Sequence, residues 1–237
     1  MEKPDYGLYA PGVIRNLGLG GLAFLAIALG LVFGNGQRWM SVLGFLIAAA
    51  VLFAEVVAMI WSSRSGKFIA RDRLLADLEL QGHERVLDVG CGHGLLLIGA
   101  AKLVPQGRAV GIDLWSQEDQ GKNAREHTLH NAKLEGVAER VEVQTGDMRK
   151  LPFGDGEFDA VVASLSIHNI PDAAGRAEAV REIVRVLKPG GRIALMDFRS
   201  TGEYAAAASA AGLQNVARSG MWLSIFPPVR VVTGRKA

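Results

Sequence analysis

The chain has 237 residues, enough for one full-sized domain with an additional element. Its net charge of +2, without a basic stretch interleaved with aromatic residues, excludes the composition typical of nucleic-acid-binding proteins, so no nucleic acid is expected as a partner. Cys91 is the single cysteine, which excludes an intrachain disulfide and favours a reducing compartment. Charge is unevenly distributed, because residues 17–63 carry only Arg38 and Glu55.

Two apolar segments follow one another near the N-terminus. Residues 16–37 carry no charge, and residues 39–61 carry only Glu55. A helix of about 20 apolar residues spans the roughly 30 Å hydrocarbon core of a bilayer. Residues 34–38 (GNGQR) predict a tight turn, and Trp39 and Trp61 lie where interfacial aromatic residues are typical. The sequence therefore predicts an N-terminal segment (1–12) and then a transmembrane helical hairpin (13–62) with the lipid bilayer as its partner.

Two other interpretations of these segments are a signal peptide and a pair of buried core helices. A signal peptide has a shorter apolar region, roughly 7 to 15 residues. A soluble helix usually has a polar face, which the first segment lacks. The alternatives are therefore disfavoured, and a homo-oligomer formed through the hairpin is left open.

Basic residues predict the orientation of the hairpin. The turn holds only Arg38, whereas the opposite end is flanked by Lys3, Arg15, Arg64, Lys67, Arg71 and Arg73. Positive residues favour the cytoplasmic side, so both termini and the domain that follows are expected in the cytoplasm. The expected localisation is integral to the inner or plasma membrane.

Glu55 stands out because an ionisable residue in a span is a candidate functional residue. The position lies six residues before Trp61, which is about 9 Å by helical rise. Pairing with Arg15, or protonation, is the structural alternative and is preferred. After the hairpin, residues 63–84 predict an amphipathic connecting helix that either covers the following domain or lies on the membrane surface.

A glycine-rich loop follows the first strand of that domain. Residues 85–94 read RVLDVGCGHG, in which Asp88 lies within the apolar strand and three glycines open the turn into the next helix: Gly90, Gly92 and Gly94. Glycine suits positions where the backbone approaches a ligand closely or adopts a positive φ. The next strand ends in Asp113, where a carboxylate can accept both hydroxyls of a ribose.

This loop differs from the dinucleotide fingerprint G-x-G-x-x-G. Leu95 stands where the third glycine would be, and the Asp88 carboxylate would repel a pyrophosphate. An NAD-dependent oxidoreductase is therefore the less favoured enzyme hypothesis.

Five segments, taken in order, resemble the motifs of class I S-adenosylmethionine (SAM)-dependent methyltransferases. They are VLDVGCGHG, GIDL, TGDM, FDAVVASLSIHNI and VLKPGGRIALMDF, and the resemblance extends over residues 66–237. The branch that includes quinone and small-molecule methyltransferases is especially similar. The resemblance implies an α/β fold over residues 85–237: a Rossmann-like, seven-stranded, mostly parallel sheet with the last strand antiparallel. The two transmembrane helices predicted above precede it. Alternating strands and helices favour the same architecture, with ligands at the carboxyl ends of the strands.

The resemblance also implies a set of SAM contacts. The backbone at Gly90, Cys91 and Gly92 would run alongside the methionine moiety, with Asp88 near its amino group, and Gly94 is also counted as a cofactor-binding residue. Asp113 would hold the ribose hydroxyls and Leu114 would pack on the adenine. Asp147 would accept the adenine amino group beside Met148, and Ser164 would line the methionine side through its backbone.

His168 is the candidate catalytic base, because it follows the fourth strand, on the side expected for the acceptor. A packing or loop-capping histidine is the alternative. Asp197 would contact substrate or stabilise a loop, and Trp115 would line the adenine or simply pack. His127 and His130 are expected on a solvated helix surface; no metal is expected, because no further ligands converge with them.

These features predict a membrane-anchored SAM-dependent methyltransferase with a small, amphipathic or lipid-like acceptor. A non-catalytic SAM-binding membrane protein is the alternative from another functional class.

Overall fold

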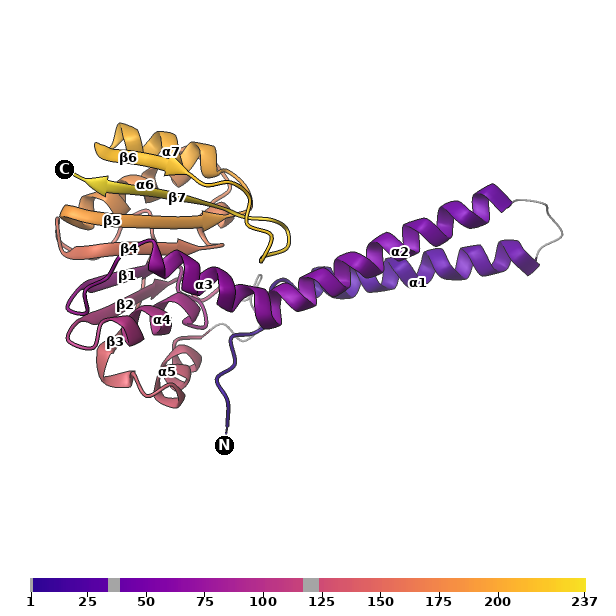
Figure 1. Ribbon diagram of the computed structural model, residues 1–237, viewed down its shortest axis with the longest axis horizontal. Helices are drawn as coiled ribbons and strands as arrows, with labels where there is room; N and C mark the ends of the chain where they lie inside the picture. Colours follow the sequence, from indigo (N-terminus) through magenta and orange to yellow (C-terminus); the bar gives the residue numbers. More distant parts are fainter. Residues whose placement is uncertain (1, 34–38, 117–123) are drawn as a thin grey trace.

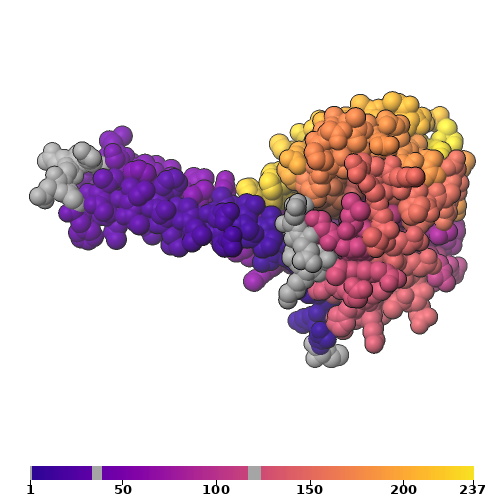
Figure 2. Space-filling view, turned by 180° about the vertical axis from the view of Figure 1, so that it is seen from behind, coloured from indigo at the N-terminus to yellow at the C-terminus, as the bar shows by residue number. Residues whose placement is uncertain are grey.

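A helical hairpin projects from an α/β domain in the computed structural model, which describes residues 2–33, 39–116 and 124–237 (Figure 1). Helices α1 (Pro11–Phe33) and α2 (Trp39–Trp61) form the two arms of this hairpin. The turn predicted at residues 34–38 lies outside the described residues. Figure 2 shows that the hairpin contacts the domain only at its base.

Most of the hairpin surface is apolar and is not covered by the rest of the chain. The most apolar 18-residue stretch of α1 has a mean hydropathy of 2.1, and that of the continuous helix at residues 39–76 has a mean hydropathy of 2.5. Only 11% of each stretch is buried. By length and composition, both helices are able to cross a membrane. The large exposed side chains include Leu22, Leu29, Leu43 and Ile47.

Residues 62–67, here called the joint, connect the hairpin to the domain. A five-residue π-helix (Ser62–Gly66) continues α2 into α3 (Lys67–Ala76), so the chain passes from one to the other without a loop. Ser62 Oγ accepts a hydrogen bond from Phe226 N, and Ser63 Oγ accepts one from Tyr9 N, both at 3.0 Å. The joint therefore binds two segments that are distant in sequence.

Helix α3 packs on the domain, which resolves the two alternatives for the connecting helix. Ala70, Leu74 and Leu75 are at most 2% exposed and belong to the domain core. Arg73 projects from the helix, with its guanidinium carbon 4.1 Å from the centre of the Trp222 ring. This packing holds the base of the hairpin against the domain.

The domain contains one seven-stranded sheet with the order β3-β2-β1-β4-β5-β7-β6. Its strands are β1 (Arg85–Val89), β2 (Arg108–Asp113), β3 (Val141–Thr145), β4 (Phe158–Ser164), β5 (Leu187–Asp197), β6 (Leu213–Arg218) and β7 (Arg230–Lys236). Strands β1 to β5 pair in parallel, and β7 is antiparallel to both of its neighbours. The predicted Rossmann-like sheet with an antiparallel last strand is confirmed.

Helices cover both faces of the sheet. They are α4 (Leu95–Leu103), α5 (Arg125–Leu134), α6 (Ala173–Val186) and α7 (Thr201–Ala210), with short 3-10 helices at Ala138–Arg140 and Ile167–Asn169. Successive strand residues point to opposite faces, so Val86 packs in the core beneath α3 and α4, and Leu87 packs in the core beneath α6 and α7. Both faces of the parallel sheet are thereby buried, as expected for this class.

The fifth strand begins earlier than the sequence predicts. Residues 188–191 (KPGG) are expected to end the preceding helix and form a turn, but β5 already begins at Leu187, which pairs with Phe158. The register then shifts before Ala160 pairs with Arg192. Gly190 has a φ of +77°, which accommodates the irregular backbone within the strand.

Substituting Gly66 by alanine tests the joint. A Cβ at Gly66 would overlap the backbone oxygen of Ser224, whereas one at Gly44 in α2 would meet nothing within 4 Å. We expect Gly66→Ala to reduce the free energy of unfolding by about 1–3 kcal/mol. Gly44→Ala is the matched control and should not destabilise the protein. Thermal unfolding of the detergent-solubilised full chain measures both, and equal melting temperatures would contradict the described contact.

Candidate active site

The glycine loop lies between β1 and α4. Gly90, Gly92 and Gly94 have φ values of +74°, +48° and +86°, which disfavour other residues. At Gly90 a Cβ would also lie 2.2 Å from Cβ of Ser166. Ser166 is itself fixed by a 2.8 Å hydrogen bond from its Oγ to the Val89 carbonyl. The loop therefore has a defined, strongly curved backbone close to the β4 end of the sheet.

Helix α5 holds this loop from the other side. Thr128 Oγ1 donates to the Gly92 carbonyl at 2.5 Å, and Asn131 Nδ2 donates to the His93 carbonyl at 3.0 Å. Both side chains are fully buried and lie one helical turn apart. The sequence gives no local signal for either role, because the contacts join segments more than 30 residues apart.

Asp113 stands at the carboxyl end of β2. Its Oδ2 accepts from Gly92 N at 2.9 Å, and its Oδ1 accepts from Trp115 N at 2.6 Å. An ionised carboxylate offers about four acceptor positions, so it can bind hydroxyl donors in addition to these amides. The Trp115 indole instead donates to Thr145 Oγ1 at 2.8 Å.

Asp88 lies beneath the loop and is 2% exposed. Its Oδ2 accepts a hydrogen bond from Leu97 N at 2.9 Å. Burial raises the pKa of Asp88 to about 7; the Leu97 amide opposes this rise, and the charge of Asp113 adds to it. The carboxyl group is thus half ionised near neutral pH, and a neighbouring cation would favour its ionised form.

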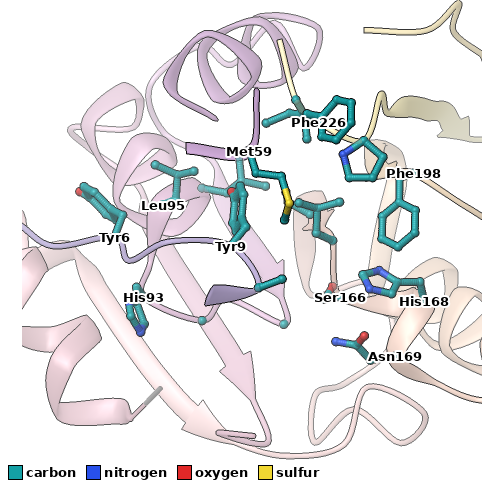
Figure 3. A pocket seen from close by; sticks show the side chains of 18 of the residues that line it. Tyr6, Tyr9, Met59, His93, Leu95, Ser166, His168, Asn169, Phe198 and Phe226 are labelled. Atoms are coloured by element: carbon teal, nitrogen blue, oxygen red, sulfur yellow. The ribbon is translucent and has the colours of Figure 1, made fainter. Parts of the chain in front are cut away.

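A cavity of about 640 Å³ opens beside the loop, and four parts of the chain contribute to its lining. From the sheet and its loops come Asp88, Gly90, Cys91, Gly92, Asp113, Ser164 and His168. From the hairpin come Val13, Leu17, Glu55 and Met59. The N-terminal segment contributes Tyr6 and Tyr9, and the β6–β7 connection contributes Phe226 (Figure 3).

His168 lies on the wall of this cavity and contacts Asp197. The His168 Nδ1 atom is 2.9 Å from Asp197 Oδ1. The Asp197 carboxylate also accepts from Phe198 N at 2.8 Å and from the Tyr204 hydroxyl at 3.1 Å. A carboxylate accepts only, so this contact places the proton on Nδ1 and the lone pair of a neutral imidazole on Nε2. Such a pair is able to take a proton from a bound molecule.

Several predicted contact residues lie outside the lining of this cavity. Asp147 forms an ion pair with Arg149, at 2.6 Å between Oδ2 and Nη2, and this arginine lowers the pKa of Asp147. Leu114 is 59% exposed, and Met148 packs against the core beneath α6. Gly94 supports the loop by its conformation.

His127 is not simply a solvated surface residue. Its Nε2 lies 2.7 Å from the Asp5 carbonyl, so it holds the N-terminal segment against α5. His130, on the exposed side, contacts Glu2 at 3.1 Å. Within residues 2–33, 39–116 and 124–237, no group of three or more histidine, cysteine, aspartate or glutamate side chains is arranged to hold a metal ion.

The residues present fit SAM. A Cβ at Gly90 would fill the space beside Ser166, and the positive φ values allow the close backbone approach that a bound ligand requires. Asp88 and Asp113 supply carboxylates of the kind that bind an ammonium group and ribose hydroxyls. Sequence reasoning missed the aromatic and hairpin residues of the cavity, since only the tertiary fold brings them to the loop.

Part of the chain is similar to known methyltransferases. Residues 87–195 match the family model described as a methyltransferase domain. The chain is 36% identical over 127 residues (54% of this chain, 43% of the relative) to 27-O-demethylrifamycin SV methyltransferase of Amycolatopsis mediterranei. It is 37% identical over 125 residues (51% and 45%) to the ubiquinone/menaquinone biosynthesis C-methyltransferase UbiE of Pseudomonas entomophila.

A solved structure shares the fold. The SAM-dependent methyltransferase from Aquifex aeolicus superposes with a TM-score of 0.55 and 19% identity, over 70% of this chain and 89% of that one. The chain spans less than half the length of the two curated relatives. The matched region, its relatives and the sheet order together support a class I SAM-dependent methyltransferase domain in this chain, with SAM as its cofactor.

Proposed function

We propose that this chain is a membrane-anchored methyltransferase that transfers a methyl group from SAM to a small amphipathic acceptor. The observation that carries the proposal is the cavity, which the glycine loop and the base of an apolar hairpin line together. The relatives named above are methyltransferases of 27-O-demethylrifamycin SV and of ubiquinone/menaquinone biosynthesis, which supports a small-molecule acceptor.

The anchor in this proposal is the pair α1 and α2. Each has 23 residues, which gives about 34 Å of helix at 1.5 Å per residue. Their exposed apolar side chains match a hydrocarbon environment, and Trp61, 48% exposed, stands at the domain end where an interfacial residue is expected. The basic residues at that end favour a cytoplasmic domain, with both termini on the same side of the inner or plasma membrane.

In this proposal the cofactor lies along the glycine loop. Asp88 faces its amino group, Gly90, Cys91 and Gly92 pass the methionine moiety, and Asp113 holds the ribose. Ser164 lines the methionine side. Leu114, Asp147 and Met148 would bound the adenine. The raised pKa of Asp88 agrees with a site that receives a cation.

The chain then positions the acceptor and removes its proton. When bound, SAM supplies a methyl group on a sulfonium, which an acceptor lone pair takes while the sulfur keeps the electrons of the broken bond. His168 Nε2 accepts the proton that the acceptor loses, and Asp197 stabilises the imidazolium through Nδ1. Apolar walls exclude water and orient the acceptor, which is the main contribution a protein makes to such a displacement.

Cofactor affinity should depend on the ionisation of Asp88. Because its pKa is raised to about 7, the carboxyl is mostly protonated at pH 6 and mostly ionised at pH 8. The ionised form favours the ammonium group of the cofactor, so the ratio of wild-type to Asp88→Asn affinity for S-adenosylhomocysteine should rise about tenfold from pH 6 to pH 8. Calorimetric titration measures it. Titration of the ligand affects both proteins equally and cancels in this ratio. A ratio that does not change with pH would count against binding of the ammonium group by Asp88.

Replacing His168 should separate catalysis from cofactor binding. His168→Ala should lower kcat about 100-fold or more, and Asp197→Asn should lower it less, because the base remains but is poorly oriented. S-adenosylhomocysteine affinity should change by no more than about twofold in either variant. The control is His130→Ala, an exposed histidine paired with Glu2. Equal rates for His168→Ala and His130→Ala would rule out the catalytic role.

Methyl-labelled SAM tests the proposed function itself. The full chain in membrane vesicles should transfer label to a component of a membrane-lipid extract and not to a water-soluble extract. Label in neither extract, despite binding of S-adenosylhomocysteine, would favour a non-catalytic SAM-binding protein. Stronger thermal stabilisation by NADH than by S-adenosylhomocysteine would contradict the cofactor assignment.

A further inference from the structure

The base of the hairpin forms one wall of the catalytic cavity. Helix α1 contributes Val13 and Leu17, and α2 contributes Glu55 and Met59. Each pair is spaced four residues apart and therefore lies on one face of its helix. Met59 is 6% exposed, and Figure 3 shows it beside Tyr9, with His168 and Phe198 across the cavity. The hairpin is thus part of the site as well as an anchor.

The four residues lie at matched depths. Val13 and Met59 each lie two residues from the domain end of their helices, and Leu17 and Glu55 each lie six residues from it. By helical rise these positions are about 3 Å and 9 Å into the hairpin. The cavity therefore extends from the glycine loop to a level that the proposed membrane anchor places inside the bilayer.

Glu55 is the single ionisable side chain that α1 and α2 contribute to this cavity. Across the residues that the structure describes, Glu55 forms no ion pair, and the pairing with Arg15 considered from the sequence is not among the contacts formed. An ionisable group at this depth is costly unless a polar partner or water meets it. A donor group on a bound molecule would supply that partner.

The β6–β7 connection and the end of β5 add apolar side chains to the cavity. Phe226 and Ile225 from the β6–β7 connection and Phe198 after β5 lie around the same space. The joint fixes the connection, since Phe226 N donates to Ser62 Oγ. A flat or chain-like apolar group fits between these side chains, whereas a water-soluble metabolite without apolar surface would leave them in contact with water.

Resting on the proposed function, we propose that Glu55 and Met59 belong to the acceptor-binding site. The acceptor is an amphipathic lipid that reaches the cavity from the bilayer along the base of α1 and α2. Its apolar part contacts Met59, Leu17 and Phe226, and a hydroxyl or amine donor on it binds the Glu55 carboxylate. The nucleophilic atom then lies on the His168 side. Glu55 is a specificity-determining residue, not the base.

Four variants of the full chain in lipid nanodiscs test this proposal. Met59→Trp fills the cavity, and Val57→Trp is the matched control, because Val57 is 65% exposed on the same helix. Glu55→Leu removes the side-chain oxygens that accept a hydrogen bond, and Glu55→Gln retains one amide oxygen, which is a weaker hydrogen-bond acceptor. With membrane-lipid extract and labelled SAM, we expect kcat/KM to fall about tenfold or more in Met59→Trp and Glu55→Leu, and less in Glu55→Gln. Val57→Trp should match wild type.

A second measurement does not require turnover. Mass spectrometry of lipid retained by the purified protein with S-adenosylhomocysteine should show a species that wild type and Val57→Trp keep and Met59→Trp loses. Retention by wild type without methyl transfer would reject the proposed function but support this site. Two results would overturn the proposed acceptor site and leave the proposed function intact. One is methyl transfer at the wild-type rate in all four variants. The other is equal retention of the lipid by Met59→Trp and Val57→Trp.

Discussion

The hydrogen bonds of the joint determine how the two parts of this protein meet. Ser62, Ser63 and Lys67 are at most 3% exposed, and each binds backbone of a segment distant in sequence. Lys67 Nζ donates to the carbonyls of Tyr6 and Gly7, at 2.8 and 2.6 Å. Buried polar groups need such partners, and here the partners belong to segments that line the cavity beside the glycine loop. These bonds act together with the packing of α3 to hold the base of the hairpin beside the cavity.

The continuous helix through the joint has a second consequence. Because α2 runs into α3 without a loop, and α3 packs in the domain core, the direction of the hairpin is fixed relative to the sheet. The carboxyl ends of β1, β2 and β4 face the base of the hairpin, since residues at these ends and at that base line one cavity (Figure 1). In a membrane-anchored enzyme this arrangement would keep the cofactor loop next to the lipid surface and shorten the path of an apolar acceptor.

Local patterns predict much of this architecture. Three features depend on residues close together in sequence, and all three appear in the structure. They are the glycine loop with Asp88 and Asp113, the order of strands and helices, and the two apolar segments. The sequence does not predict that Tyr9, Glu55 and Met59 line the same cavity as His168, because only tertiary packing joins them. The sequence also does not predict the early start of β5, because this too depends on tertiary pairing. Leu187 pairs with Phe158, and this pairing overrides the Pro-Gly-Gly signal for a turn.

We propose that the cavity beside the glycine loop, shared between the α/β domain and the hairpin, is the catalytic site. An experimental structure of the full chain in lipid nanodiscs, with S-adenosylhomocysteine bound and membrane-lipid extract added, tests it most directly. We expect cofactor density along Gly90–Gly92, acceptor density between Met59 and His168, and Trp61 at the level of the lipid headgroups. A hairpin detached from the domain, or one lying outside the lipid disc while the cofactor site is filled, would show that the hairpin does not take part in the site.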